Sequence, residues 1–482
     1  MIFQTEIKGG GTTPAVQKYK VTVIDYDGTV ITEQLVDSGS TFTLPAAPTT
    51  HSRLTFQGWV SPVPVSNGQI TVDNQDIVVG ASYKTVTGKT EFDITLTTAS
   101  GLTFTCNMSG NKDWGDGTTD SLTSHTYATA GDYTIVCDGN TIPYGVFGQS
   151  WSAINYTCKE IRIGNSVEVQ SSAFQVCQGL KAIVIPDSSA MGSSMCDSCY
   201  NLNAVVLPYG IGNPGDYCFS GCQNMNYIVL PYGLTYIGYQ FLHGCVRLET
   251  ICIPSTVTNF GEGAFQDCRS VNKIIIPTGT ISIPQFMLES CYSLEEIIIP
   301  NTVTSIGGAV TRACRSLKTI TYPSSVTSIG NQQTNNSGVQ TIIMSPTSSI
   351  TFADNVFDES PCLTNITMPL TTEIPNNFAV YSPIKSVVIP NGVTTIGTQA
   401  YMGATPSVIS FPASVSLIKA WCIGGASLTE MDFSNHTSVP TIEADAFFEL
   451  NSTLKIKVPS ALYNSWIAAT NWSAYANYIE AV

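Results

Sequence analysis

Charge is scarce in this sequence of 482 residues, and positive charge is the scarcer sign. Charged residues make up 11% of the chain, with 20 Lys and Arg against 35 Asp and Glu, so the formal net charge is −15. Phosphate backbones and anionic lipid surfaces attract basic surfaces, which this composition does not offer. We therefore expect neither nucleic acid nor an anionic membrane among the partners.

Long apolar runs are also missing. No stretch approaches the ~18 residues that a transmembrane helix needs, so we expect no membrane insertion. The first residues, Met1 to Gly11, contain no basic segment followed by an apolar one, which is the pattern of a secretory signal. We expect that the protein is made and folded in a cytoplasm, or that a leader has been removed.

Motifs of familiar catalytic chemistry are absent as well. The four histidines lie far apart, and there is no G-x-S-x-G, P-loop or H-E-x-x-H motif. Adjacent carboxylates such as Glu295 and Glu296 would point to opposite faces of a strand and could not act as a pair. We predict no enzymatic activity and no catalytic, cofactor-binding or metal-binding residues. A polysaccharide depolymerase is the enzyme alternative, which turnover of capsular glycan would establish.

What the sequence does contain is a repeat. An apolar-x-apolar triplet followed by proline recurs along the C-terminal two thirds, from Ile183–Pro186 to Ile456–Pro459. The prolines of the central run follow one another at a constant spacing, and the steps around this run are slightly shorter. The central prolines are Pro208, Pro231, Pro254, Pro277, Pro300, Pro323, Pro346 and Pro369. With related triplets at both ends, the chain holds about fourteen units.

Each unit has the features of one coil of a β-solenoid. The triplet is a short strand with two side chains inward and one outward, and proline ends it because proline lacks a backbone donor. A second apolar stretch follows, such as Val303 to Gly307, and then Ala-Phe-x-x-Cys or a variant, as at Ala264 to Cys268. Stacked units bury the apolar face that one unit cannot. We predict a mainly β, multi-domain chain dominated by a solenoid of about fourteen repeats, each of about 22–23 residues.

The repeat resembles the BspA-like leucine-rich-repeat family, as in Leu294 to Gly307, which reads L-E-E-I-I-I-P-N-T-V-T-S-I-G. The resemblance covers about residues 160–459. It implies a leucine-rich-repeat solenoid and a role in adhesion, which the family serves in bacteria, some protists and phage particles. The sequence departs from the pattern over 331–362, where Asn331 to Gly338 replaces Ala-Phe-x-x-Cys. We expect this stretch to loop out.

Seven of the 15 cysteines recur at one position per repeat, in step with the prolines. They are Cys177, Cys199, Cys222, Cys245, Cys268, Cys291 and Cys314. Leucine-rich repeats place Asn or Cys at such a position, where a small polar side chain bonds the backbone of the turn. We interpret the seven as a structural ladder of buried free thiols. Disulfides or zinc are the alternatives, because neighbours in a ladder lie ~5 Å apart.

Further segments flank the repeats. Residues 1–17 are rich in glycine and are predicted to form a flexible arm. Residues 18–87 alternate apolar and polar side chains, with a hairpin turn at Asp25–Gly28 and the element Phe56-Gln57-Gly58-Trp59. These features resemble the Listeria–Bacteroides (internalin B-type) repeat. The resemblance implies a small β-grasp-like module in which Trp59 packs in the core.

Residues 88–142 contain D-W-G-D-G-T at Asp113–Thr118, then H-T-Y at His125–Tyr127 and G-D-Y-T-I at Gly131–Ile135. This combination resembles PKD domains, which implies a compact β-sandwich of immunoglobulin type. We interpret Asp116 as the cap of a turn. The alternative is a calcium site formed by Asp113, Asp116 and Asp120.

The solenoid is predicted to span residues 143–459 and to end in a capping element at residues 460–482. In this last segment apolar residues recur at helical spacing, with Ser460 as the expected helix N-cap. A short helical cap would cover the last open coil, as solenoids require.

The middle residue of each triplet points outward and forms a column along the predicted sheet. The column begins with six apolar residues and becomes more polar toward the C-terminus, reading Val184, Val206, Val229, Cys252, Ile275, Ile298, Thr321, Met344, Thr367, Val388, Ser410, Asp432 and Lys457. We propose Val184, Val206, Val229, Ile275 and Ile298 as a contact surface for a partner or a second copy of the chain. The alternative is that these side chains only pack on each other. Ile275→Glu with Ile298→Glu is expected to leave the monomer folded and to abolish assembly or adhesion.

These features favour a non-enzymatic structural or adhesion protein. The first hypothesis is a phage virion component, such as a head or tail fibre or decoration protein, because the missing leader and the free thiols fit synthesis in a reducing cytoplasm. Its partners would be other virion proteins, through the N-terminal arm and modules, and a glycan or protein of the host surface. A homo-oligomer is a further expectation. The alternative is a bacterial cell-surface adhesin whose export signal has been removed.

Overall fold

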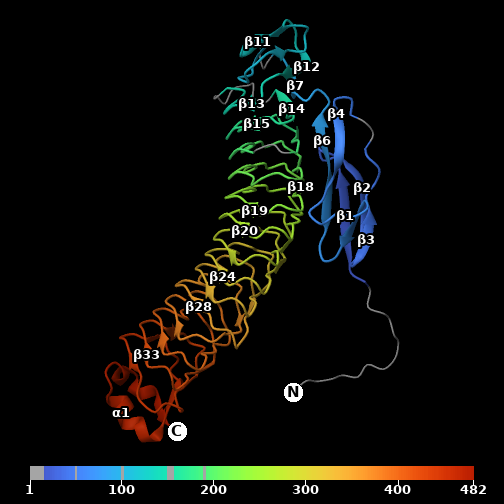
Figure 1. Ribbon diagram of the computed structural model, residues 1–482. Helices are drawn as coiled ribbons and strands as arrows, with labels where there is room; N and C mark the ends of the chain where they lie inside the picture. The colour runs from blue at the N-terminus through green and yellow to red at the C-terminus, as the bar shows by residue number, and fades with distance from the viewer. Residues whose placement is uncertain (1–15, 49–50, 99–101, 149–156, 188–190) are drawn as a thin grey trace.

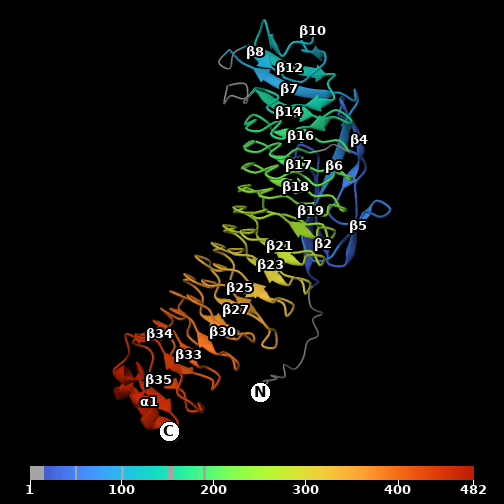
Figure 2. The ribbon, with the colours of Figure 1, turned by 60° about the vertical axis from the view of Figure 1, so that its left-hand side comes forward.

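The computed structural model describes residues 16–48, 51–98, 102–148, 157–187 and 191–482. The chain forms an elongated, mainly β stack of coils that bends along its length. A small sheet module lies beside the N-terminal coils, and a short helix lies at the opposite end (Figures 1 and 2). The predicted solenoid of about fourteen coils is confirmed. Most of the predicted N-terminal arm, residues 1–15, lies outside the described residues.

The N-terminal module is a mixed four-stranded sheet with a two-stranded ribbon on one face. Its strands are β1 (Lys18–Ile24), β2 (Val30–Asp37), β3 (Ser40–Thr43), β4 (Leu54–Val60), β5 (Gln69–Val72) and β6 (Ile77–Thr85). The sheet has the order β2-β1-β6-β4, with β1 and β6 parallel, and β3 pairs with β5 in the ribbon. The predicted turn after β1 is closed by a 3.0 Å hydrogen bond from the Gly28 N–H to the Asp25 carbonyl. The likeness to a β-grasp stays a prediction.

The central strands of this module are buried on both faces. Val21, Val23 and Val79 pack against the ribbon, whereas Ile24 and Val78 pack against the solenoid. A strand in a sheet with one solvent-exposed face would alternate between buried and exposed side chains. Continuous burial from Val21 to Ile24 in β1 and from Ile77 to Tyr83 in β6 therefore reflects two packing partners, one inside the module and one outside it.

The second unit consists of two facing sheets, and the larger one continues into the solenoid. Its strands are β7 (Thr90–Leu96), β8 (Thr103–Thr105), β9 (Lys112–Asp113), β10 (Thr119–Asp120), β11 (Ser124–Thr126) and β12 (Gly131–Cys137). The first two strands of the coils are β14 (Cys158–Arg162) and β16 (Ala182–Val184). The larger sheet has the order β10-β9-β12-β7-β14-β16, and β8 pairs with β11. This unit thereby covers the first coil, and its likeness to a PKD domain stays a prediction.

Most coils contribute a short strand to one long side of the stack, which we name the sheet face. Its further strands are β17 (Ala204–Val206), β18 (Tyr227–Val229), β21 (Lys273–Ile275), β23 (Glu296–Ile298), β25 (Thr319–Thr321), β27 (Thr341–Ile343), β29 (Asn365–Ile366), β32 (Val408–Ser410), β35 (Glu430–Asp432), β38 (Lys455–Val458) and β39 (Ile479–Ala481). Neighbours pair in parallel, as Ile274 pairs with Ile297. One apolar side chain per coil, most often isoleucine, thus enters the core at the same level.

A second ladder of two-residue strands lines another side. It comprises β13 (Thr141–Ile142), β15 (Glu168–Val169), β19 (Tyr236–Ile237), β20 (Asn259–Phe260), β22 (Ser282–Ile283), β24 (Ser305–Ile306), β26 (Ser328–Ile329), β28 (Thr351–Phe352), β30 (Glu373–Ile374), β31 (Thr395–Ile396), β33 (Leu417–Ile418) and β36 (Thr441–Ile442), with β34 (Ile423–Gly424) and β37 (Phe447–Phe448) pairing beside it. These short pairs hold the coils in register.

The third side is a column of turns that contains the cysteine ladder. The seven ladder thiols are free and buried. From Cys199 to Cys314, each thiol donates to a backbone carbonyl of the preceding coil at 3.1–3.3 Å. Burial raises the pKa of Cys245 and Cys291 to about 12, which keeps these thiols protonated donors. Ser382 continues the ladder, with its hydroxyl donating to the Phe357 carbonyl at 2.9 Å.

The expectation that Asn331 to Gly338 loops out is wrong. Gln333 and Thr334 are fully buried, and the Gln333 N–H donates to the Val356 carbonyl of the next coil at 2.8 Å. The Thr334 hydroxyl lies 2.6 Å from that of Ser360, which occupies the ladder position one coil later. Polar side chains replace the apolar ones of other coils here. They form hydrogen bonds with backbone carbonyls, as the Gln333 amide does with Gly330, or with each other, and the coil stays in the stack.

The C-terminal cap comprises η2 (Ser460–Leu462), α1 (Tyr463–Ala468) and η3 (Trp472–Tyr478). Trp466 and Trp472 are fully buried against the last coil. Ser460 does not cap a helix as predicted, because its hydroxyl donates to the Val482 carbonyl at 2.8 Å instead. In the described part of the chain, no helix combines the length and the apolar character of a membrane span.

Candidate binding face

The sheet face is the surface for which the sequence predicts a partner, and its first half is already covered. Val184, Val206 and Val229 are 2%, 5% and 1% exposed, because the N-terminal module packs on them. The prediction of an open contact surface at these three residues is therefore wrong. Figure 1 shows the module lying alongside these coils. The partner of this part of the column is another part of the same chain.

Strand β6 lies across the covered coils at very short range. A Cβ atom on Gly80 would overlap the side chain of Val206 and approach that of Val229 to 3.0 Å. Polar contacts flank this apolar centre. The Asn203 amide donates to the Asp27 carbonyl at 2.8 Å, and the Ser61 N–H donates to the Tyr209 hydroxyl at 3.1 Å. Glycine at position 80 is thus required for the docking distance.

We expect Gly80→Ala to loosen the module without unfolding the solenoid. The added methyl group has no space over Val206, and such overpacking costs about 1–3 kcal/mol. Hydrogen exchange should become faster in β6 and in β16 to β18, while the coils beyond β23 keep their protection. Gly212→Ala is the control, since nothing lies within 4 Å of its added Cβ. Equal exchange in Gly80→Ala and wild type would contradict this docking.

Beyond the module the sheet face is open, and we name its outward residues from Ile298 to Ser410 the open face. Ile275 is half-buried at the edge of the module, whereas Ile298 is 36% exposed. The large aliphatic side chains of the open face are Ile298, Ile343, Val388 and Val408. Met344 was predicted to point outward here, but it is 1% exposed. Ile343 takes its place, at 41% exposure, because it pairs with Thr321.

The open face from Ile298 to Ser410 carries aliphatic and hydroxyl side chains. Thr321, Thr367 and Ser410 are exposed between the aliphatic residues. Charge pairs lie at its two ends. Glu296 of β23 pairs with Lys273 at 2.9 Å, and on the last coils Lys457 pairs with Glu430 at 2.8 Å and Lys455 with Glu480 at 2.9 Å. A partner of this surface need not supply opposite charge, so packing and hydrogen bonding to hydroxyls would decide recognition.

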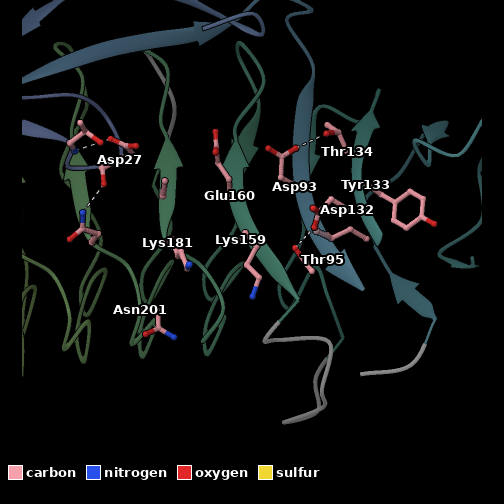
Figure 3. Close-up of a pocket in the computed structure, with 14 residues that line it drawn as sticks. Asp27, Asp93, Thr95, Asp132, Tyr133, Thr134, Lys159, Glu160, Lys181 and Asn201 are labelled. Atoms are coloured by element: carbon pink, nitrogen blue, oxygen red, sulfur yellow. Dashed lines mark hydrogen bonds between the residues drawn. The ribbon is translucent and has the colours of Figure 1, made fainter. Parts of the chain in front are cut away.

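A groove of about 730 Å³ lies where the module, the second unit and the first coils meet. In Figure 3 Asp27 of the module stands on one side, Asp93 and Asp132 of the second unit on the other, and Lys159 and Lys181 between them. The groove therefore presents both signs of charge. Its carboxylates are largely engaged within the chain, as Asp132 accepts a 2.6 Å bond from the Thr95 hydroxyl.

Arg162 neutralises the floor of this groove. Its side chain is 4% exposed and contacts Glu91 at 3.0 Å, Asp93 at 2.6 Å and Glu160 at 2.6 Å. Burial alone would raise the pKa of Asp93, but hydrogen bonds and charge from Arg162 outweigh it and lower that pKa. The Tyr26 hydroxyl of the module donates to Glu160 at 2.9 Å. One buried cation thus links all three units.

The aspartates considered for calcium hold turns instead. The Asp116 carboxylate accepts the Thr118 N–H at 3.0 Å, which is the predicted turn cap, and lies 2.7 Å from the His125 ring. Asp120 accepts a 2.9 Å bond from the indole N–H of Trp114. Over the described ranges, no cluster of three or more His, Cys, Asp or Glu side chains has the geometry of a metal site. The lack of a metal, a cofactor and catalytic residues stays a prediction.

Comparison with known proteins identifies the repeats. The family described as BspA type leucine rich repeat region matches in six copies, over residues 141–272, 189–310, 281–405 and 372–469. These matches span well over half of the 482 residues. No curated protein matches the chain.

Solved structures share the fold. A leucine-rich repeat protein from Bacteroides ovatus is 23% identical over 74% of this chain and 90% of its own, with a TM-score of 0.60. A leucine rich cell surface protein from Faecalibacterium prausnitzii is 20% identical over 66% and 91%, with a TM-score of 0.31. The pneumococcal vaccine antigen PcpA is 13% identical over 93% and 100%, with a TM-score of 0.36. The repeat match, supported in fold by the Bacteroides structure, shows that this chain belongs to the BspA-type leucine-rich-repeat family.

Proposed function

We propose that this protein is a non-enzymatic adhesion protein that acts at a bacterial cell surface and binds a protein partner through the open face. The single observation that carries the proposal is that the same column of outward side chains already binds a β-sheet in its first half. Both halves carry outward aliphatic side chains, but the open half also carries hydroxyl side chains and has no partner within the described chain.

The docked module indicates what kind of partner fits the open face. It presents Ile24, Val60 and Val78, which are uncharged aliphatic residues, and it approaches the strands closely at Gly80. An uncharged, fairly flat protein surface with a small residue at its centre would pack on Ile343 and Val388 in the same way. Burial of aliphatic area contributes about 25 cal/mol per Å², so such a contact needs no ion pairs.

The experiment replaces two open-face residues with charge. Ile343→Glu with Val388→Glu is expected to reduce the adhesion of protein-coated beads to bacterial and epithelial cells at least tenfold, about 1.4 kcal/mol or more. Both side chains are already about half exposed, at 41% and 54%, so the fold should tolerate the change. Size-exclusion chromatography of the same variants tests whether a second copy of the chain is the partner.

The control variant introduces two glutamates at exposed apolar positions outside the open face. Leu122→Glu with Ile281→Glu alters side chains that are 61% and 57% exposed and lie off the open face, and it should bind like wild type. Protease treatment of the cells should remove the binding site. Undiminished adhesion of the Ile343 and Val388 variant would refute the open face as the site. Adhesion that survives protease and is lost after periodate treatment would indicate a glycan instead.

The virion hypothesis stays a prediction, because neither the family nor the related structures bear on it. Family membership is compatible with the cell-surface alternative, since the role that the family resemblance implies is adhesion. An antibody against the chain distinguishes the two by labelling either intact cells or purified phage particles. The depolymerase alternative requires that purified protein release reducing ends from capsular glycan, and we expect none.

A further inference from the structure

Two cysteines outside the ladder face each other inside the second unit. Cys106 and Cys137 are both 0% exposed, and their Sγ atoms are 3.8 Å apart. Cys137 ends β12 in the larger sheet, whereas Cys106 follows β8 in the smaller sheet. The two sulfurs therefore lie between the two layers of this unit, in a core that includes Phe104 and Ile135.

The partners of these thiols differ from those of the ladder thiols from Cys222 onward, whereas Cys199 at the start of the ladder also contacts the thiols of Cys177 and Cys196. Ladder thiols such as Cys245 and Cys268 donate to backbone carbonyls of the neighbouring coil at 3.3 Å. Cys106 and Cys137 are hydrogen-bonded to each other instead. A disulfide needs its sulfurs at about 2.0 Å, so a modest rotation of both side chains would bring this pair to bonding distance.

The surroundings lower the pKa of the Cys106 thiol. The hydrogen bond with Cys137 lowers the pKa of Cys106 against the opposing effect of burial, and the Met108 N–H and the charge of Lys112 lower it further. Lys112 is itself fully buried, and it pairs with Cys137 across β9 and β12. The thiolate is the nucleophile of thiol–disulfide exchange, so Cys106 is suited to react first.

We propose that Cys106 and Cys137 form a disulfide when the protein meets an oxidising environment. A low-molecular-weight disulfide such as glutathione disulfide is the oxidant. The Cys106 thiolate attacks one of its sulfurs, forming a mixed disulfide and releasing one thiolate. The Cys137 thiolate then attacks Cys106 Sγ, forming the protein disulfide and releasing the second. The protons of the two cysteines end on the two released thiols. Because both sulfurs are buried, the exchange takes place while the unit folds or opens.

The bond would tie the two layers of the unit that covers the first coil. It would close a loop between residues 31 positions apart, which restricts the unfolded chain. The inference is independent of the adhesion proposal, since it concerns the stability of the unit and not the open face.

The test uses the full chain refolded with a mixture of reduced and oxidised glutathione, then alkylated under denaturing conditions and digested. We expect one cross-linked peptide pair containing Cys106 and Cys137, and a rise of about 5–10 °C in the thermal midpoint of the unit relative to the reduced chain. Cys106→Ser should remove both the cross-link and the rise. Cys268→Ser, a ladder variant, should keep both.

Mass spectrometry of wild type keeps the test decisive if Cys106→Ser does not fold. The oxidised chain should be lighter by two hydrogen atoms after refolding, with the loss located at Cys106 and Cys137. Full alkylation of both residues in the refolded, oxidised wild type would overturn the proposal. So would a bond from either of them to a different cysteine, or glutathione attached only at the half-buried Cys362.

Discussion

Arg162→Met should destabilise the N-terminal half of the molecule by about 3–5 kcal/mol at neutral pH, because it leaves buried carboxylates without their cation. Glu91 is 0% exposed and lies 3.0 Å from the guanidinium, while Asp93 and Glu160 lie within 2.6 Å of it. Arg53 approaches Glu91 only to 3.4 Å and is itself half exposed, so it cannot replace Arg162. Urea unfolding at pH 7, followed by tryptophan fluorescence, measures the loss.

The pH dependence separates lost charge pairing from lost packing. In wild type the pKa of Asp93 is lowered, so its stabilising contribution is complete above its unfolded pKa of about 3.9 and is lost as pH falls through the lower folded value. Without Arg162, the effect of burial should dominate and raise the pKa of Asp93. The variant should therefore gain stability between pH 7 and pH 4.5, and its deficit relative to wild type should shrink.

The matched control is Arg269→Met. Arg269 also pairs with an aspartate, Asp267 at 2.8 Å, but its side chain is 51% exposed. Exposed pairs contribute about 0–1 kcal/mol, so this change should be nearly neutral. A deficit of Arg162→Met that is equal at pH 7 and pH 4.5 would mean that packing, not charge, accounts for the loss.

Trp472→Ala should open the C-terminal end of the solenoid. Trp472 is fully buried, its ring centroid lies 5.4 Å from those of Phe433 and Trp466, and its indole N–H donates to the Pro440 carbonyl at 2.8 Å. Truncating such a side chain costs about 3–5 kcal/mol. Loss of the cap would also expose the edge of β38, which pairs with β39 in wild type. Free strand edges associate, so the variant should form end-to-end oligomers.

Sedimentation velocity and hydrogen exchange measure these two effects. Exchange should become faster in β35 to β39 and remain slow in the central coils, because each coil contacts mainly its neighbours. Trp421→Ala removes an indole that is 45% exposed and should leave the protein monomeric. A Trp472→Ala chain that stays monomeric with normal protection of β38 would show that the cap is dispensable.

The solenoid could be predicted from the sequence because the apolar positions of each repeat are the positions whose side chains are buried in the core. One inward apolar residue per coil, followed by proline in most coils, fixes the strand, and the near-constant spacing fixes the stack. The prediction of the outward residue was wrong where the spacing between successive strands changes. Ile342 pairs with Ile320 of one neighbouring coil and with Ile366 of the other, so the first step is shorter than the spacing of the prolines and the second is longer. A constant step counted from the prolines therefore selected Met344 instead of Ile343 as the outward residue.

The covered half of the sheet face could not be predicted from the column itself. Apolar outward residues look the same whether solvent, a partner or another part of the chain lies over them. The feature that indicates a covering partner lies in β6, where Ile77 to Ser82 are all buried and do not alternate with exposed residues. The coil at Asn331–Gly338 was misread because several of its buried polar groups are hydrogen-bonded to a neighbouring coil, such as the Thr334 hydroxyl to that of Ser360, and the sequence of the coil alone does not show these partners. Cys106 and Cys137 have no pattern that links them.

The hydrogen bonds between coils point along the axis of the stack, and this gives the molecule a mechanical character. The Ile276 N–H bonds the Ile298 carbonyl at 3.0 Å, and the Gly307 N–H bonds the Ile283 carbonyl at 2.8 Å, each joining one coil to the next. Tension applied to the two ends loads these bonds lengthwise, so coils separate one after another at low force. The module packs on the coils from Ala182 to Cys252 and holds them together from one side. We therefore expect extension under load to begin in the coils nearer the C-terminus, which have no such contact.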